Sequence, residues 1–550
     1  PVSIATIAAI AIGEYSAAAV VAVLLLVGGL LEDFVAARAN QSLESLARLL
    51  PDRVIVRRDG RDLTVCLEDV AVGDLLLVRS GDRIAVDGLV VSGSASVNQA
   101  AITGESLAVE KKTGDNVFAG TLNEVGAMEV RVTRIGRETT LGQIHVLIEE
   151  AQASKPPIER LLSRYARIYM PTALFAGALL WWWSGDVMRA ITMLIVFCPC
   201  VIVLATPTAL VAAIGSAAMR GSLIKKGAAV EALSHVDTVI FDKTGTLTAG
   251  KPRLMQIIPL GAVSQDRLLE SAAIAEKFSE HPLGRALVSA AKDRSMKLMD
   301  PEHFEALPGL GIRSRVGECD VFLGSVGSLE REGIAIDGAV REKARALQES
   351  GCNVILVAIN SRTEGLFAFE DELRPQSKPV VQKLADLGLN VVIVTGDSQA
   401  ATERVAMTLG VREHFSEKMP QEKVQIVKKL QSLGHRVAFV GEGVNDGPAL
   451  AQADVGIAMG IAGTDVAIET ADVGLLSDDL SKMPHLIMVS RKAIATIKHN
   501  LVFSLGVLAI AVALTVPGIL TPVTGAMLHE LSSIPVIANS MRLIAYGPKI

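Results

Sequence analysis

The chain has 550 residues, of which 50% are apolar and 20% are charged, and its formal net charge is −6. Its length predicts several domains, and its positive mean hydropathy favours membrane spans between soluble domains over a purely soluble enzyme. The negative charge argues against nucleic acid as a partner. The five cysteines (Cys66, Cys198, Cys200, Cys319 and Cys352) lack the spacing of a disulfide framework, which fits a reducing cytosol around the soluble parts.

Uncharged apolar runs occur in pairs, and a spanning helix needs about 20 such residues. We expect six spans from the runs at 1–13, 15–31, 168–185, 190–219 and 500–541, the last of which is broken near "TVPGILTP". The chain begins inside an apolar run without a signal-peptide pattern, so we expect a truncated first helix and further N-terminal sequence. Basic residues such as Arg220, Lys226 and Lys492 flank the spans on the side of the soluble blocks, which the positive-inside rule places in the cytoplasm. The sequence thus predicts an integral protein of a bacterial or archaeal plasma membrane, in contact with membrane lipid.

The first soluble block, at about 33–165, alternates β-branched residues with turn signals, as in "RVIVRRDGRDLTVCLEDV". This alternation predicts a small β-rich domain.

The span at 190–219 contains "CPC", in which two cysteines flank a proline. Cysteine thiolates are soft ligands for transition metals, and a proline bends a spanning helix where a ligand or neighbour compensates. Cys198 and Cys200 diverge by about 200° on a regular helix, so both sulfurs face one site only if the helix unwinds at Pro199. The alternatives are two packing cysteines beside a kink, or a disulfide, which this spacing would strain.

The second soluble block, at about 220–495, contains buried-type strands that end in polar turns: "VIFDKTGT", "VVIVTGD" and "VAFVGEGVND". Separated by helical patterns, they predict a doubly wound α/β domain with its chemistry at the carboxyl ends of the strands. Residues 251–364 interrupt it as an inserted domain. Asp242 at a strand end can attack a phosphoryl group, while Lys423 and a magnesium ion held by acidic residues of 441–446 supply positive charge.

These motifs, in this order and with "TGES" at 103–106, resemble the P-type ATPases, and the resemblance covers essentially the whole chain. It implies a transmembrane α-helical bundle, a β-rich actuator domain, a doubly wound α/β (HAD-like) phosphorylation domain and an inserted α+β nucleotide-binding domain. The implied boundaries are 1–32 for a helix pair, 33–165 for the actuator, 166–219 for the helix pair with CPC, 220–250 and 365–490 for phosphorylation, 251–364 for nucleotide binding and 491–550 for the last helix pair.

The resemblance also implies roles for single residues. Asp242 is the nucleophile that becomes an aspartyl phosphate, and Lys423 holds the phosphate. Thr244 replaces the acid–base aspartate of related phosphatases, so the phosphoenzyme persists until Glu105 orients a hydrolytic water. The remaining catalytic positions are Lys243, Thr246, Thr395, Asp397 and Asn445, and the Mg(II) region comprises Asp242, Thr244, Glu442 and Asp446.

One residue departs from the family pattern, because GDGxND is usual where this chain has Glu442. Glutamate is still an oxygen ligand but is longer by one methylene, and Mg(II) is strict about geometry. We expect slower phosphorylation; the alternative is a catalytically impaired metal-binding membrane receptor.

The inserted domain contains "SEHPLG" and "LPGLGI", which resemble the nucleotide-binding domain of the heavy-metal (type IB) branch. The resemblance implies that His281 stacks near the adenine of ATP, with Glu276, Gly309 and Gly311 around the nucleotide. The alternatives are a helix-capping histidine and a bare glycine turn. Ser325 stands where that branch often has asparagine.

Type IB pumps also have CPC in this span, which favours Cys198 and Cys200 as ligands of a transported metal. In the last span, "HELSS" is close to the His-Glu-Gly-Ser-Thr of a cobalt-type branch. That branch usually has Ser-Pro-Cys rather than CPC, so the metal signature of this chain is mixed. With His529, Glu530 and Ser532 the set suits Zn(II), Cd(II) or Co(II), and Mn(II) through Glu530 and Ser532. An interfacial polar pair is the alternative for His529 and Glu530.

The sequence therefore predicts an ATP-driven exporter of a divalent transition-metal ion, with ATP and Mg(II) as cofactors and a metal-delivering protein as a further partner. A Cu(I) exporter is the alternative. A soluble phosphatase of the same α/β fold is disfavoured by the spans and TGES, and a potassium or magnesium pump by CPC.

Overall fold

The protein was analysed as a computed structural model. It describes residues 2–547 except 25, 28, 31–49, 59, 100–107, 144–145, 147–156, 199, 262, 280, 308–309, 443–445 and 461–469. Two compact units result, one formed by Pro1–Val236 with Ile457–Ile550 and the other by Asp237–Gly456.

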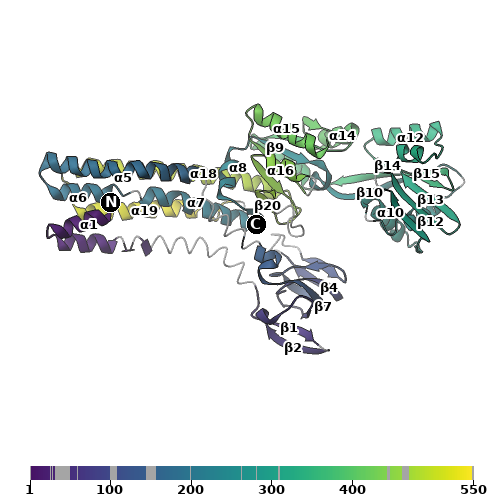
Figure 1. Ribbon diagram of the computed structural model, residues 1–550, viewed down its shortest axis with the longest axis horizontal. Coiled ribbons are helices and arrows are strands. Elements are labelled where there is room, and N and C mark those ends of the chain that lie inside the picture. Colours follow the sequence, from purple (N-terminus) through teal and green to yellow (C-terminus); the bar gives the residue numbers. More distant parts are fainter. Residues whose placement is uncertain are drawn as a thin grey trace. The chain divides into compact units, whose positions relative to one another are not determined.

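The first unit contains a bundle of apolar helices. They are α1 (Val2–Ala11), a helix at Tyr15–Leu24, α5 (Pro157–Ser184), α6 (Val187–Val196), α7 (Cys200–Ala218), α18 (Lys482–Thr515) and α19 (Pro522–Met541). Helix α18 contacts both α7 and α19, and α6 contacts α5 and α19, so these helices run side by side (Figure 1). Among the described residues α18 alone is both long and apolar enough to span a membrane, and Tyr15–Leu24, Val187–Val196 and Ala205–Ala218 are shorter apolar helices.

Two predicted interruptions of the apolar runs are present. Helix α6 ends at Val196 and α7 begins at Cys200, so the run at 190–219 forms two helices rather than one. Helix α18 ends at Thr515 and α19 begins at Pro522, which stands in the first turn where a proline costs no hydrogen bond. The first interruption leaves Cys198 outside regular helix, as unwinding near the proline requires.

The first unit also contains the predicted β-rich part. Its strands are β1 (Arg53–Arg58), β2 (Arg61–Cys66), β3 (Leu75–Val78), β4 (Asp87–Asn98), β5 (Val109–Lys112), β6 (Asn116–Val117) and β7 (Leu122–Arg134), with short 3-10 turns at Leu67–Asp69 and Gly136–Glu138. In the described part they form an antiparallel sheet in the order β2-β1-β3-β7-β4-β5, with β6 on β4. Alternate residues such as Val56, Val90 and Val130 fill its core, as the period of two predicts.

A smaller part of the first unit is formed by segments from both sides of the second unit in the sequence. Strand β8 (Ser222–Ile224) pairs antiparallel with β20 (Val473–Leu475), and α8 (Gly227–His235) contacts α18.

The second unit is built around a parallel sheet, as predicted for a doubly wound domain. Its strands are β9 (Thr238–Asp242), β16 (Asn390–Val394), β17 (Glu413–Phe415), β18 (Val437–Gly441) and β19 (Val455–Ala458), in the described order β17-β16-β9-β18-β19. The connecting helices are α13 (Ser377–Asp386), α14 (Gln399–Leu409), α15 (Pro420–Ser432) and α16 (Gly447–Gln452). Because β9 lies between β16 and β18, the carboxyl ends of these three strands meet at one edge.

The inserted part of this unit has an antiparallel sheet in the order β10-β15-β14-β13-β12-β11. Its strands are β10 (Thr248–Pro259), β11 (His303–Leu307), β12 (Gly311–Val316), β13 (Cys319–Gly324), β14 (Asn353–Ile359) and β15 (Arg362–Leu373), and its helices are α9 (Gln265–Ala275), α10 (Pro282–Asp293), α11 (Val326–Arg331) and α12 (Gly338–Glu349). Strands β10 and β15 pair along their length and connect this sheet to the parallel one.

Candidate functional site

Asp242 is the last residue of β9 and is buried, with 5% of its surface exposed. The turn Lys243–Leu247 follows it directly. Gly245 in this turn has φ = +77°, and a Cβ there would lie 1.7 Å from Oε2 of Glu442. The positive φ favours glycine at this position, and the side chain of Glu442 would have to move to admit any other residue, so the glycine of "DKTGT" suits the turn that presents Asp242.

Lys423 neutralises the nucleophile. It lies in the first turn of α15, and its Nζ donates hydrogen bonds to Oδ1 of Asp242 at 2.6 Å and to Oδ1 of Asp446 at 2.7 Å. All three side chains are buried. Burial and then the neighbouring Asp446 carboxylate raise the pKa of Asp242 to about 7, against the effect of Lys423. Burial alone lowers the pKa of Lys423, but the two carboxylates outweigh it and the pKa is raised.

A second ion pair lies at the same strand ends, between Lys243 and Asp397. The backbone N–H of Asp397 donates to Oγ1 of Thr395, and the N–H of Thr395 donates to the carbonyl of Phe415 on β17. These bonds fix the "TGD" turn after β16, which the sequence predicted to lie beside the nucleophile.

The two threonines of the turn differ in environment. Thr246 is fully buried, and its Oγ1 has no hydrogen-bond partner among the described residues. Thr244 is exposed. A buried hydroxyl without a partner is available to a ligand, because leaving it unpaired costs about 1–3 kcal/mol.

The residues of the Mg(II) region fit a divalent cation in charge. Asp242 and Asp446 share the single ammonium group of Lys423, so one negative charge in this buried place is uncompensated when Asp242 is ionised. Glu442, directly after β18, places its carboxylate against Gly245 of the turn that follows Asp242. Oxygen ligands of this kind are those that Mg(II) prefers. The described residues do not form a cluster of three or more acidic, histidine or cysteine side chains that holds a metal by itself, and Asn445 lies outside the description.

Arg374 is a residue of this site that the sequence analysis missed. Its Nη2 donates to the carbonyl of Gly245 at 2.7 Å and its Nε donates to that of Thr246 at 3.1 Å. Arg374 thereby holds the turn behind Asp242 from the far end of the insertion. Its signal in the sequence is weak, because "LRP" after a strand indicates only a turn.

The inserted domain has a cavity of about 1060 Å³. Its lining includes three predicted residues, Glu276, His281 and Gly311, and also Ser325. Gly309 lies outside the described residues. Gly311 has φ = +137°, and a Cβ there would lie 2.0 Å from the carbonyl oxygen of Leu323, so only glycine fits.

Two of these side chains also cap helices. His281 is the N-cap of α10, where Nδ1 accepts from the N–H of Leu283, and Ser325 is the N-cap of α11, where Oγ accepts from Ser328. The capping alternative for His281 is therefore correct, and its ring is nevertheless exposed at the cavity.

Glu276 is the unusual acid of this cavity. It is buried with 4% exposure, burial raises its pKa, and its Oε2 has no partner among the described residues. A Cβ at Gly284 would lie 2.3 Å from this oxygen, so the glycine of "HPLG" makes room for the carboxyl group. This role of Gly284 has no signal in the sequence beyond its place in "HPLG".

A small cavity of about 30 Å³ lies among the end of α6, α18 and α19, large enough for one ion or water. Cys198, His529 and Ser532 line it, together with Ser504 of α18, which the sequence analysis missed. Glu530 is not among its described lining residues, and the side chain of Cys200 is outside the description. Cys198 is disulfide-bonded here, so its sulfur becomes a metal ligand only after reduction.

Polar side chains connect the helices beside this cavity. Nδ2 of Asn500 donates to Oγ of Ser540 at 2.9 Å, and Nδ2 of Asn539 donates to Oδ1 of Asn500 at 2.8 Å. Ser504 donates to the carbonyl of Asn500, so the cavity and this network share one turn of α18.

Comparison with known proteins gives the family. Residues 48–149 match the P-type ATPase actuator domain and residues 236–454 match the haloacid dehalogenase-like hydrolases. A crystal structure of a zinc-transporting PIB-type ATPase in the E2.Pi state is 35% identical with a TM-score of 0.65, over 99% of this chain and 89% of that one. A probable cadmium-transporting ATPase of Staphylococcus aureus is 38% identical over 561 residues, 100% of this chain and 77% of the relative. The chain belongs to the type IB P-type ATPases.

Copper proteins are nearly as similar to this type IB ATPase. A copper-exporting P-type ATPase of Bacillus subtilis is 37% identical over 96% of this chain and 67% of its own length. The predicted family, fold class and activity, ATP hydrolysis coupled to ion transport, are confirmed. Glu105 of "TGES" lies outside the described residues, and the roles of the single site residues stay predictions.

Proposed function

We propose that this type IB ATPase exports a divalent transition-metal cation from the cytosol, with Zn(II), Cd(II) or Co(II) as the first candidates and Mn(II) as the further one. The observation that supports this best is the cavity that Cys198, His529 and Ser532 line. A thiolate with an imidazole and an oxygen donor forms a borderline set, which suits these ions better than a purely soft one. The cadmium- and zinc-transporting proteins among its relatives agree with this assignment.

The phosphorylation chemistry follows from the strand ends of the second unit. An oxygen of Asp242 forms a bond to the γ-phosphorus of ATP as the bond to the β–γ bridging oxygen breaks, and ADP leaves. Lys423 moves from the carboxylates toward the transferred phosphoryl oxygens, and the Lys243–Asp397 pair fixes the neighbouring turn. Mg(II) held by Asp242, Asp446 and Glu442 neutralises the phosphate charge when bound.

The 1060 Å³ cavity of the inserted domain binds the ATP that phosphorylates Asp242. Its apolar and aromatic lining, which includes Phe278 and Leu283, suits a purine base. Glu276 with its free oxygen accepts a hydrogen bond from the base or ribose. Hydrolysis of the aspartyl phosphate then requires a water oriented by Glu105. The catalytic domains lie in the cytoplasm, where a metal-delivering protein meets the chain.

A Cu(I) exporter is the second candidate, because the cysteines of "CPC" are soft ligands and copper proteins are among the relatives. The two candidates differ in their need for His529. A thiolate-only Cu(I) site does not use the imidazole, whereas a borderline divalent site does.

The test is ATPase activity of the full chain reconstituted in lipid under reducing conditions, with Cu(I), Zn(II), Cd(II), Co(II) and Mn(II) in turn. We expect stimulation by a divalent ion, abolished in Asp242→Asn and reduced in His529→Ala. His303→Ala, on the surface of the inserted domain, is the matched histidine control and retains the response. Stimulation by Cu(I) alone that is indifferent to His529→Ala replaces the divalent assignment with the copper one. No stimulation by any ion favours the receptor alternative.

A further inference from the structure

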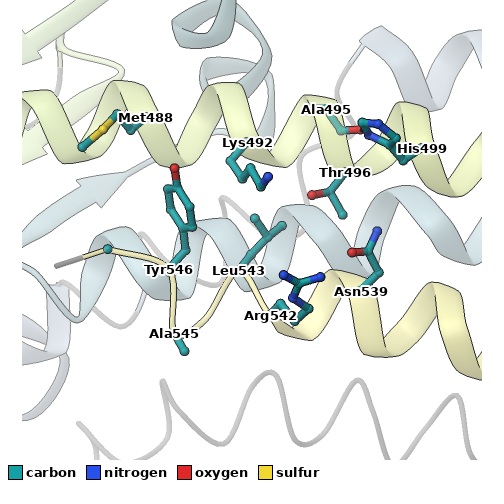
Figure 2. Close-up of a pocket in the computed structure, with 11 residues that line it drawn as sticks. Met488, Lys492, Ala495, Thr496, His499, Asn539, Arg542, Leu543, Ala545 and Tyr546 are labelled. Carbon is teal, nitrogen blue, oxygen red and sulfur yellow. The ribbon is translucent and has the colours of Figure 1, made fainter. Parts of the chain in front are cut away.

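Besides the 30 Å³ metal cavity, the helices of the first unit form a cavity of about 700 Å³ between α18 and the end of α19. Its polar lining comes from Lys492, Thr496 and His499 on α18 and from Asn539, Arg542 and Tyr546 on α19 and the segment after it. Figure 2 shows Lys492 and Arg542 extending from these two elements toward the same space. We call it the basic cavity.

The charge of the basic cavity is one-sided. No aspartate or glutamate is among the described residues that line it. Lys492 and Arg542 are both exposed, and neither takes part in an ion pair with the described acidic residues. Two cations that face one cavity repel each other, and an anion between them replaces this repulsion with two attractions. The cavity is thus suited to an anion and unsuited to the passage of a metal cation.

Neutral donors surround the two cations. Tyr546 extends its ring toward α18, and Thr496 and Asn539 lie on the opposite side of the lysine (Figure 2). His499 donates from Nδ1 to the carbonyl of Ala495 at 2.6 Å, so Nε2 of the neutral ring is an acceptor and His499 is not one of these donors. Lysine, arginine, hydroxyl and amide groups together are the donors that phosphate oxygens accept.

The sequence position of the cavity indicates the source of the phosphate. The uncharged run of α18 begins at Asn500, immediately after Lys498 and His499, so the cavity lies at the end of the spanning segment where lipid headgroups are found. Immediately beyond it on α18, Val502 is 72% exposed, and Phe503 and Leu505 are also exposed. A ligand with a phosphate and an apolar tail contacts both surfaces.

We propose that the basic cavity binds the phosphate of an anionic phospholipid headgroup, with the acyl chains along the exposed apolar side of α18. The lipid connects α18 to α19 at the turn where Asn500 and Asn539 bond to each other. It therefore stabilises the packing of the two helices that also line the metal cavity. This inference does not depend on which ion is transported.

The test uses the purified full chain in nanodiscs of phosphatidylcholine, with and without phosphatidylglycerol, and measures the unfolding temperature. We expect phosphatidylglycerol to raise this temperature, and Lys492→Gln and Arg542→Gln each to remove most of the increase. Lys498→Gln is the matched control, an exposed lysine on the same helix outside the cavity lining, and retains it. Phosphoenzyme formation from ATP verifies that each variant is folded.

A further arm adds inorganic phosphate to the phosphatidylcholine nanodiscs. An equal increase there assigns the cavity to a soluble anion and overturns the lipid proposal. An equal loss in Lys498→Gln shows a general charge effect and overturns it too, as does the absence of any increase in the natural chain. If the two variants fail to fold, native mass spectrometry of the natural chain decides, because preferential retention of phosphatidylglycerol over phosphatidylcholine is required.

Discussion

The phosphorylation site and the metal cavity differ in how their residues are held. In the second unit, Asp242, Lys423 and Asp446 meet at the carboxyl edge of one sheet. Buried hydrogen bonds of 2.6 and 2.7 Å link them. In the first unit, Cys198 comes from the break between α6 and α7 and His529 from α19, and they meet only at a 30 Å³ cavity, beside an asparagine–serine network. The catalytic side chains are thus already held together by short hydrogen bonds at one sheet edge. The metal site instead depends on how several helices pack.

The largest effect is expected from Lys423→Met, which tests the prearranged site. It leaves the carboxylates of Asp242 and Asp446 buried without a cation, so the catalytic unit loses about 3–5 kcal/mol of stability. Loss of the charge that faces the phosphate lowers the phosphorylation rate about 10²–10³-fold. Rapid-quench phosphorylation and thermal unfolding measure both effects. The control Lys429→Met, at an exposed position of the same helix, is expected to change neither.

Asn500→Ala tests the helix packing in the other unit. It removes two hydrogen bonds, the one to the buried Ser540 and the one to the half-buried Asn539, which costs about 1–3 kcal/mol. Ser540 keeps its bonds to Val536 and Thr208. We expect a lower unfolding temperature and weaker metal stimulation, with phosphorylation of Asp242 by inorganic phosphate retained. Ile510→Ala, at an exposed position ten residues further along α18, serves as the control. Loss of phosphorylation by inorganic phosphate in Asn500→Ala contradicts the separation of the two sites.

The pH dependence of stability tests the charges of the phosphorylation site. The pKa of Asp242 is raised from 3.8 to about 7, so the folded state favours the protonated carboxyl group. Without Mg(II), its contribution to stability is therefore present below about pH 4 and is lost as the pH rises through about 7. Asp242→Asn, which stays neutral, becomes more stable than the natural chain over this window, and Mg(II) closes the gap.

Unfolding temperatures of both proteins between pH 5 and 8, with Mg(II) or with a chelator, measure this difference. A gap that does not change with pH shows that Asp242 is ionised throughout and that Lys423 alone compensates it.

The smallest effect is expected from Glu442→Asp. The Glu442 carboxylate lies against Gly245, and aspartate withdraws it by one methylene toward the family pattern. Because Mg(II) demands near-ideal geometry, we expect phosphorylation at limiting Mg(II) to become faster by a factor of a few. A slower variant indicates that this chain has adapted its site to glutamate.

Local sequence determined most of the catalytic half of the protein. A buried strand followed by "DKTGT" places a carboxylate at a strand end, and the order of the motifs predicted the family, the doubly wound sheet and the β-rich part that are confirmed. The breaks at "CPC" and "TVPGILTP" were also predictable, because proline acts on the backbone of its own turn.

Only the tertiary structure decided which distant groups meet. Arg374 bonds to the turn behind Asp242 from 129 positions away, Gly284 makes room for Glu276, and Ser504 rather than Glu530 lines the metal cavity. The basic cavity between α18 and α19 has no motif at all. The physical reason is that backbone preferences act over a few residues, whereas a cavity is set by the packing of side chains from separate helices.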